Sequence, residues 1–191
     1  MGAVYSSHAD REFTRFGLQT FAGDARRAVN LLGDLVTNSA WNSAELELVK
    51  EQVSQEHEDN HNRYHETTIE NAHFNSFREH MLGQPKKGDR DLTHTIGIDH
   101  LRNFYAANYY GDNIVVVATG AVNHDQIVDA VEQNFSSLQK STSIPRSNGH
   151  RPIYTPSLLM LRDDEMVNSN VGVFYDAPGV NHEDYFAFRL M

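Results

Sequence analysis

The pattern of apolar residues at the start of the chain predicts two short strands. Residues 3–5 form a short apolar run, and β-prone residues recur between residues 13 and 20. The segment from His8 to Asp10 lies between the two runs and predicts the turn that joins them. A strand so close to the first residue also predicts that part of the domain precedes it.

An amphipathic helix is predicted next. Apolar residues recur three and four positions apart from Ala25 to Val36, which places them on one face of a helix. Asp24 precedes this stripe, and aspartate is a residue type that caps helix N-termini. The helix is expected to end near Asn38, where the apolar spacing stops.

The long polar stretch from Asn42 to Met81 predicts one or two further helices. Val49 and Val53 are spaced as part of a buried helix face, but the same spacing next reaches Glu56 or His57. Ionisable residues at such positions indicate one of two arrangements: the helix leaves the core, or it faces a polar site. The pattern alone leaves both open.

The second half of the chain predicts more α/β structure. Spaced apolar residues at 98–105 predict a short helix. The continuous apolar run at 113–119 predicts a strand that is buried on both faces. Asn123 is placed to cap a helix that carries apolar residues as far as Leu138.

The last third of the chain contains a predicted linker. Residues 141–152 are rich in Ser, Thr, Arg and Pro, which is a linker composition. Beyond it, residues 158–162 and 171–175 predict an antiparallel strand pair, and a last helix is predicted from Asn181. The chain therefore divides into residues 1–140, the linker, and residues 153–191.

Composition and charge exclude several classes of function. The 191 residues carry 26 acidic and 16 basic side chains, for a net charge of −10, which argues against a nucleic-acid partner. The absence of cysteine excludes disulfides, thiolate metal sites and a cysteine nucleophile. No apolar run in the sequence approaches the length of a transmembrane segment.

One metal-binding motif is visible in the polar stretch. The string from His57 to His61 matches H-E-x-x-H, in which two imidazoles one helical turn apart bind Zn²⁺ and the glutamate polarises a water. Its flanks are charged and polar, and a segment so rich in His and Glu produces such matches by chance. A solvated helix face is the competing interpretation, and we prefer it.

Several strings of residues, in a fixed order along the chain, carry a resemblance to a known family. They are Met1-Gly2-Ala3, Arg11 to Phe16, Arg27-Ala28-Val29, Asn38-Ser39, Ile98 to Tyr110, Ile114 to Gly120, His124 to Phe135, and Arg162 to Met166 followed by Gly179 and His182. The chain resembles the pitrilysin/insulinase family of zinc metallopeptidases. Within it, the nearest branches are the β subunit of mitochondrial processing peptidase and the core subunit of the respiratory cytochrome bc complex.

The resemblance implies an α+β fold, namely an incomplete pitrilysin-type domain with helices packed on one face of a mixed β-sheet. Residues 1–140 would be the C-terminal part of a first peptidase-like domain, and residues 153–191 the start of a second structural repeat. It also implies a zinc site held by an inverted motif, H-x-x-E-H, and a downstream glutamate. Glu56 falls on that glutamate, so the H-E-x-x-H match would be coincidental.

Two departures from the family pattern affect the expected activity. The H-x-x-E-H motif is absent from these residues, and by resemblance it lies upstream of Met1. The chain then contains no catalytic residue and is not expected to bind zinc tightly or to hydrolyse peptides by itself. The family's additional glutamate, two helical turns before the ligand, is replaced by Val49.

The expected function is therefore that of a fragment of a mitochondrial processing peptidase β-like subunit, whose intact form would use Zn²⁺ to cleave presequences. The presequence would pair with the edge strand at Tyr5, Ser6, Ser7 and His8. An α-type partner subunit and a mitochondrial location follow from the same resemblance. The alternatives are a non-catalytic core subunit within the respiratory complex and an independent H-E-x-x-H zinc protein.

Overall fold

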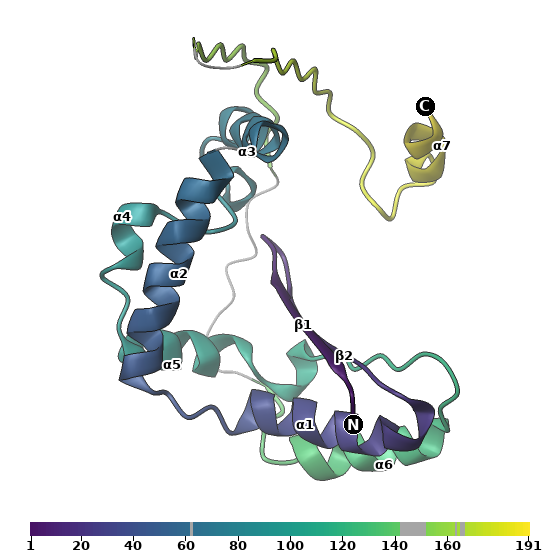
Figure 1. Ribbon diagram of the computed structural model, residues 1–191. Coiled ribbons are helices and arrows are strands. Elements are labelled where there is room, and N and C mark those ends of the chain that lie inside the picture. Colours follow the sequence, from purple (N-terminus) through teal and green to yellow (C-terminus); the bar gives the residue numbers. More distant parts are fainter. Residues whose placement is uncertain (62, 142–151, 163, 165–166) are drawn as a thin grey trace. The chain divides into compact units, whose positions relative to one another are not determined.

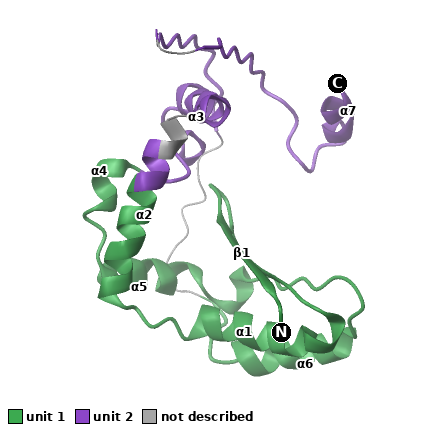
Figure 2. Cartoon of the chain, in the orientation of Figure 1, with its two compact units in different colours: residues 1–54, 89–148 green, residues 55–88, 149–191 purple. Residues whose placement is uncertain are grey.

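The computed structural model describes residues 1–61, 63–141, 152–162, 164 and 167–191, without the side chains of residues 59–61. The chain folds into two compact units (Figure 2). Unit 1 contains residues 1–54 and 89–148, and unit 2 contains residues 55–88 and 149–191. The predicted linker at 141–152 falls almost entirely outside the described residues, and the predicted domain boundaries stay a prediction.

A β-hairpin begins unit 1. Strand β1 (Val4–Ala9) pairs antiparallel with β2 (Thr14–Gln19), with Ala9 opposite Thr14 and Val4 opposite Gln19. The backbone N–H of Asp10 donates to the carbonyl of Phe13 at 2.9 Å and closes the turn. The predicted turn at His8 to Asp10 was therefore two residues early, because His8 and Ala9 continue the ladder.

Two amphipathic helices form the core of unit 1. Helix α1 (Ala25–Thr37) follows the short 3₁₀ helix η1 (Ala22–Asp24) and lies along α6 (His124–Phe135) (Figure 1). Their contact buries Ala28, Val29 and Val36 of α1 and Ala130 of α6. Both helices were predicted from apolar spacing, and the Asn123 side chain caps α6 by accepting from the N–H of Gln126 at 3.1 Å.

Polar side chains flank this helix contact. Arg26 Nη2 donates to Gln133 Oε1 at 3.0 Å, and Asn134 Nδ2 donates to Asn30 Oδ1 at 2.8 Å. Three residues after Asn30 the helices approach closely at Gly33, where an added Cβ would lie 2.6 Å from the Cβ of Asn134. The contact therefore requires a residue without a side chain at position 33.

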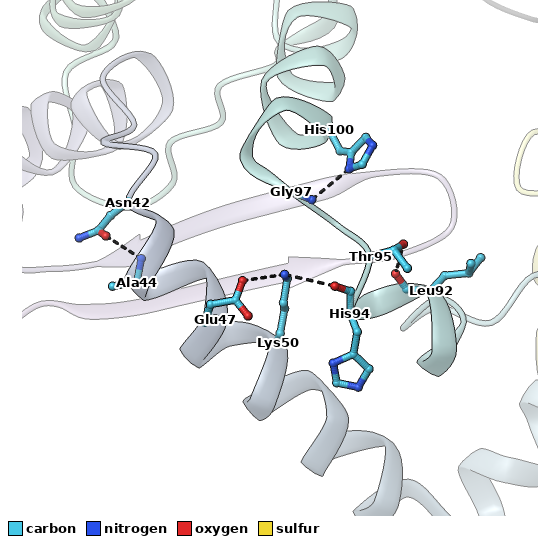
Figure 3. A network of polar contacts seen from close by, with 9 residues as sticks. All are labelled: Asn42, Ala44, Glu47, Lys50, Leu92, His94, Thr95, Gly97 and His100. Carbon is cyan, nitrogen blue, oxygen red and sulfur yellow. Dashed lines mark hydrogen bonds and ion pairs between the residues drawn. The ribbon is translucent and has the colours of Figure 1, made fainter.

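The long polar stretch forms two helices, as predicted: α2 (Ser43–His61) and α3 (Tyr64–Ser76). The buried face of α2 differs from the prediction, because Val49 is 50% exposed whereas Lys50 is only 9% exposed. Lys50 Nζ donates to Glu47 Oε1 at 2.7 Å and to the His94 carbonyl at 3.4 Å (Figure 3). The buried ammonium thus ties α2 to the segment between α4 (Arg90–Thr93) and α5 (Ile98–Asn108).

Unit 2 is built on the second half of α2 and on α3. The 3₁₀ helix η2 (Met81–Gly83) packs against α3, and the short helix α7 (Tyr185–Leu190) lies near the C-terminus. The N–H of Thr155 donates to the carbonyl of Ser76 at 2.9 Å, and the ring of Tyr154 packs edge-on against Phe77. These contacts hold the extended segment after residue 152 to the end of α3.

The α+β class is confirmed, but three predicted strands do not form in the described part of the chain. Residues 114–119, which follow the 3₁₀ helix η3 (Gly111–Asn113), are not in a strand ladder, and Val115 and Val117 are 86% and 77% exposed. Residues 158–162 and 171–175 are likewise outside any strand. An apolar run becomes a strand only where a neighbouring strand pairs with its backbone, and the described sheet consists of β1 and β2.

We expect Gly33→Ala to destabilise the protein. Alanine in place of glycine inside a helix is ordinarily stabilising by about 1 kcal/mol, but here its methyl group would meet Asn134 of α6. Overpacking of this kind costs about 1–3 kcal/mol, so a net loss of roughly 1–2 kcal/mol is expected in urea unfolding. Gly23→Ala, whose Cβ meets nothing within 4 Å, is the matched control. A stabilised Gly33→Ala variant would show that α1 and α6 do not pack as described.

Candidate functional site

Four of the predicted site residues lie on the first strand of the hairpin. Tyr5, Ser6, Ser7 and His8 lie side by side on β1, and all four are exposed. Among the described strands β1 pairs with β2 alone, so its second edge presents N–H and C=O groups that an added strand can bind. The structure thus brings these four predicted residues together on one strand.

The side-chain contacts of β1 differ between the tip of the hairpin and its middle. His8 Nε2 lies 3.7 Å from Asp10 Oδ2, and the His8 ring lies 6.3 Å from the ring of Phe13. Ser6 is opposite Gly17, where an added Cβ would lie 2.7 Å from Ser6 Oγ. Side chains thus lie near one another at the tip of the hairpin, whereas at Ser6 the strands approach closely because residue 17 is glycine.

A row of aromatic rings, missed by the sequence analysis, lies in the same unit. The rings of Tyr105 and Tyr109 stack with centroids 4.9 Å apart, and Trp41 meets Tyr105 edge-on at 5.5 Å. Their i, i+4 spacing on α5 and just beyond it was the available signal. Among the described residues other than glycine, Trp41 alone has a positive φ, 52°, a strained conformation that its packing must stabilise.

The two tyrosines of this row have altered acidity. Burial raises the pKa of Tyr105 above its ordinary value of 10.0, and neighbouring Tyr109 raises it further. Burial also raises the pKa of Tyr109, partly offset by a hydrogen bond with Thr14 of β2, with a smaller rise from Tyr5 of β1. Residues of both strands of the hairpin therefore influence the pKa of Tyr109.

Glu56, the predicted zinc ligand, lies on α2 within unit 2. Its Oε2 is 3.2 Å from the Nζ of Lys87, and the same Nζ donates to the Glu56 carbonyl at 3.2 Å. Within the described residues no group of three or more His, Asp or Glu side chains is arranged to hold a metal ion. The side chains described here do not by themselves fit a zinc ion, and we derive no catalytic step from one.

Of the two histidines in the H-E-x-x-H motif, the structure describes the side chain of His57 alone. His57 is half-buried, and its Nε2 is shielded from solvent with no hydrogen-bond partner in the described part of the chain. The side chain of His61 lies outside the described residues. Whether the two imidazoles share a ligand stays a prediction.

Two models of one peptidase family match the chain in succession. The model described as "Insulinase (Peptidase family M16)" matches residues 1–90, and that described as "Peptidase M16 inactive domain" matches residues 95–191. The chain belongs to peptidase family M16. This confirms the resemblance inferred from the ordered strings of residues.

The similar M16 proteins with curated names are subunits of a mitochondrial enzyme. The chain is 28% identical to the mitochondrial-processing peptidase subunit beta of Lentinula edodes, over 100% of this chain and 42% of the relative. It is 26% identical to the human subunit of that name, over 96% of this chain and 38% of the relative. The chain thus spans about two-fifths of the length of these relatives.

Two solved structures have a similar fold. A chain of complex III2 from Candida albicans matches with a TM-score of 0.75 at 19% identity, covering 86% of this chain and 39% of that one. A protease from Helicobacter pylori matches with a TM-score of 0.65 at 16% identity, covering 78% and 36%. These likenesses establish the fold. In the described residues, no helix has the length and apolar character required to span a membrane.

The raised pKa values predict a loss of stability at alkaline pH. A tyrosine with a higher pKa when folded than when unfolded stabilises the fold below about pH 10, and this contribution disappears as the pH rises through the folded pKa. We expect the melting temperature to fall as the pH rises above about 10, and to fall less in Tyr105→Phe/Tyr109→Phe, which keeps both rings. Parallel curves for the two proteins, measured by circular dichroism, would contradict this assignment.

Proposed function

We propose that the chain is part of a mitochondrial processing peptidase β-like subunit, a zinc-dependent endopeptidase subunit, and that β1 binds the presequence. The observation that carries the proposal is the exposed edge of β1, which is paired with β2 on one side only among the described strands. An extended peptide can pair with such an edge through its backbone, whatever its side chains. The β subunits that match along the whole chain support the choice of peptide.

The charge of the chain suits a basic peptide. A net charge of −10 attracts positively charged partners and increases the rate at which they associate. Pairing at this edge does not depend on the side chains of Ser6 and Ser7, because the edge recognises the peptide main chain. Presequence peptides are therefore the proposed partners of this edge.

In the whole protein, Glu56 would be one ligand of the zinc ion. The remaining ligands would come from residues outside this chain, in keeping with the inverted motif that the resemblance implies. An α-type partner subunit and the mitochondrial matrix, or the matrix face of the inner membrane, complete the proposal. The names of the mitochondrial relatives support this location.

A non-catalytic core subunit of the respiratory complex is the second candidate. Val49 stands where the family pattern has a glutamate, and its side chain is half-exposed on α2. A valine there cannot stabilise a cation electrostatically. The similarity in fold to a chain of complex III2 is consistent with this alternative. Peptide binding separates the two candidates, because a scaffold has no need of a free peptide-binding strand.

Proline substitution on β1 tests peptide pairing directly. Successive residues of a strand direct their N–H groups to opposite edges, so one of Ser6→Pro and Ser7→Pro interrupts pairing with β2 and the other removes a donor from the free edge. We expect the second of these to keep the melting temperature of the hairpin unit and to lose at least about tenfold in affinity for a fluorescent, basic, extended peptide.

The two adjacent variants control for each other. The variant that breaks the β1–β2 ladder is recognised by its lowered stability, and an acidic peptide of the same length controls for nonspecific binding. Wild-type affinity in the variant that keeps the hairpin intact would exclude pairing at this edge. Measurable binding of the basic peptide by the unmodified chain is a precondition that the proposal itself predicts.

A further inference from the structure

The apolar run at residues 114–118 lies in unit 1, and its backbone is free to pair. Val115 and Val117 are 86% and 77% exposed, and Val116 is 40% exposed. Ile114 has an extended backbone, with φ −110° and ψ 130°. Beyond Ile114, no backbone N–H or carbonyl of the run takes part in a backbone hydrogen bond with any described residue. A row of free donors and acceptors that carries β-branched side chains is a template on which another extended chain pairs.

No charged side chain interrupts the surroundings of this run. Residues 113–124 contain no Asp, Glu, Lys or Arg and form the longest such stretch in the sequence. The chain as a whole has a net charge of −10, so two copies repel each other in general and approach at least cost through an uncharged segment. An uncharged, β-prone segment without proline is also the type of sequence that pairs with an identical copy of itself. The run therefore fits a second copy of this chain better than it fits a charged partner.

We propose that two copies of the 191-residue chain associate by pairing their 114–118 runs as antiparallel strands. Dimers with a two-fold axis are the commonest homo-oligomers, and two strands that pair across such an axis run antiparallel. The same surface of each copy then forms both sides of the contact. This association uses a segment other than β1, so it is separate from the proposed binding of peptides.

The position of the apolar residues determines the register of this pair. A two-fold axis at Val116 makes that residue its own partner, and every residue of the 114–118 run then lies opposite another apolar residue. Val115 lies opposite the partner's Val117, and cross-strand pairs of β-branched residues stabilise a sheet. Asp112, the nearest charged residue, falls opposite a glycine, so no like charges face each other.

The absence of cysteine from the chain allows a cross-linking test of this register. Under mild oxidation we expect Val116→Cys to form an intermolecular disulfide at least about fivefold faster than Val115→Cys or Val117→Cys. The reason is that residue 116 faces its own copy directly, whereas the two copies of residue 115, or of residue 117, are diagonal neighbours about 7–8 Å apart. An equal mixture of Val115→Cys and Val117→Cys should cross-link between the two variants. Nonreducing gel electrophoresis and mass spectrometry measure each product.

An introduced charge tests the association itself. Val116→Lys places two ammonium groups opposite each other at the centre of the pair, although it makes the net charge of each copy less negative. In sedimentation velocity experiments from about 1 to 100 μM, we expect this variant to self-associate at least about tenfold more weakly than the unmodified chain. Leu158→Lys makes the same change of charge at a residue of unit 2 that is 95% exposed, and as the matched control it should leave the dimer unchanged.

An unmodified chain that stays monomeric throughout this concentration range would overturn the proposal. Equal rates of cross-linking at residues 115, 116 and 117 would also overturn it, because parallel in-register pairing or nonspecific contact gives that result. Preferential cross-linking of Val116→Cys with Ser7→Cys would pair the run with β1 of the partner subunit instead and would contradict the two-fold contact. Peptide binding at β1 is measured separately, with Val116→Lys as well as the unmodified chain, so the proposed function stands or fails independently of this result.

Discussion

The packing of α1 against α6 is the contact on which unit 1 depends. A two-stranded hairpin is marginally stable by itself in water, and β2 gains support by contacting α1. Tyr109, just beyond α5, reaches both strands of the hairpin. The exposed edge of β1 is therefore held in place by a helix pair whose apolar contact is small and whose closest approach requires glycine at position 33.

Two lysines form ion pairs with carboxylates of the polar helix α2. The sequence placed ionisable residues where a buried helix face was expected, and left open whether the helix leaves the core or faces a polar site. Lys50 pairs with Glu47 in the first half of the helix, and Lys87 pairs with Glu56 in the second half. Each half of the helix thus has a carboxylate neutralised by an ammonium.

Local periodicity predicted α1 and α6 correctly, because their apolar stripes determine both the helix and the face that it buries. The hairpin was predicted with its turn two residues early, since His8 and Ala9 have no local feature that separates strand from turn. The apolar run at residues 113–119 predicted a buried strand, but strand formation depends on a partner that a local pattern cannot supply. Lys50 was missed because lysine is ordinarily exposed, and its burial follows from tertiary contacts with residue 94. Of the site residues, Tyr5 to His8 lie on β1 and their role in peptide binding stays a prediction, whereas the Lys87 partner of Glu56 is distant in sequence.

The central claim is that the free edge of β1 binds an extended basic peptide. Residue-resolved amide hydrogen exchange of the 191-residue chain, with and without an excess of such a peptide, tests it most directly. Pairing along the edge predicts slower exchange at alternate residues of β1, from residue 4 to residue 9, with little change in β2. Unchanged exchange throughout β1 at saturating peptide, or protection confined to other elements, would contradict the claim.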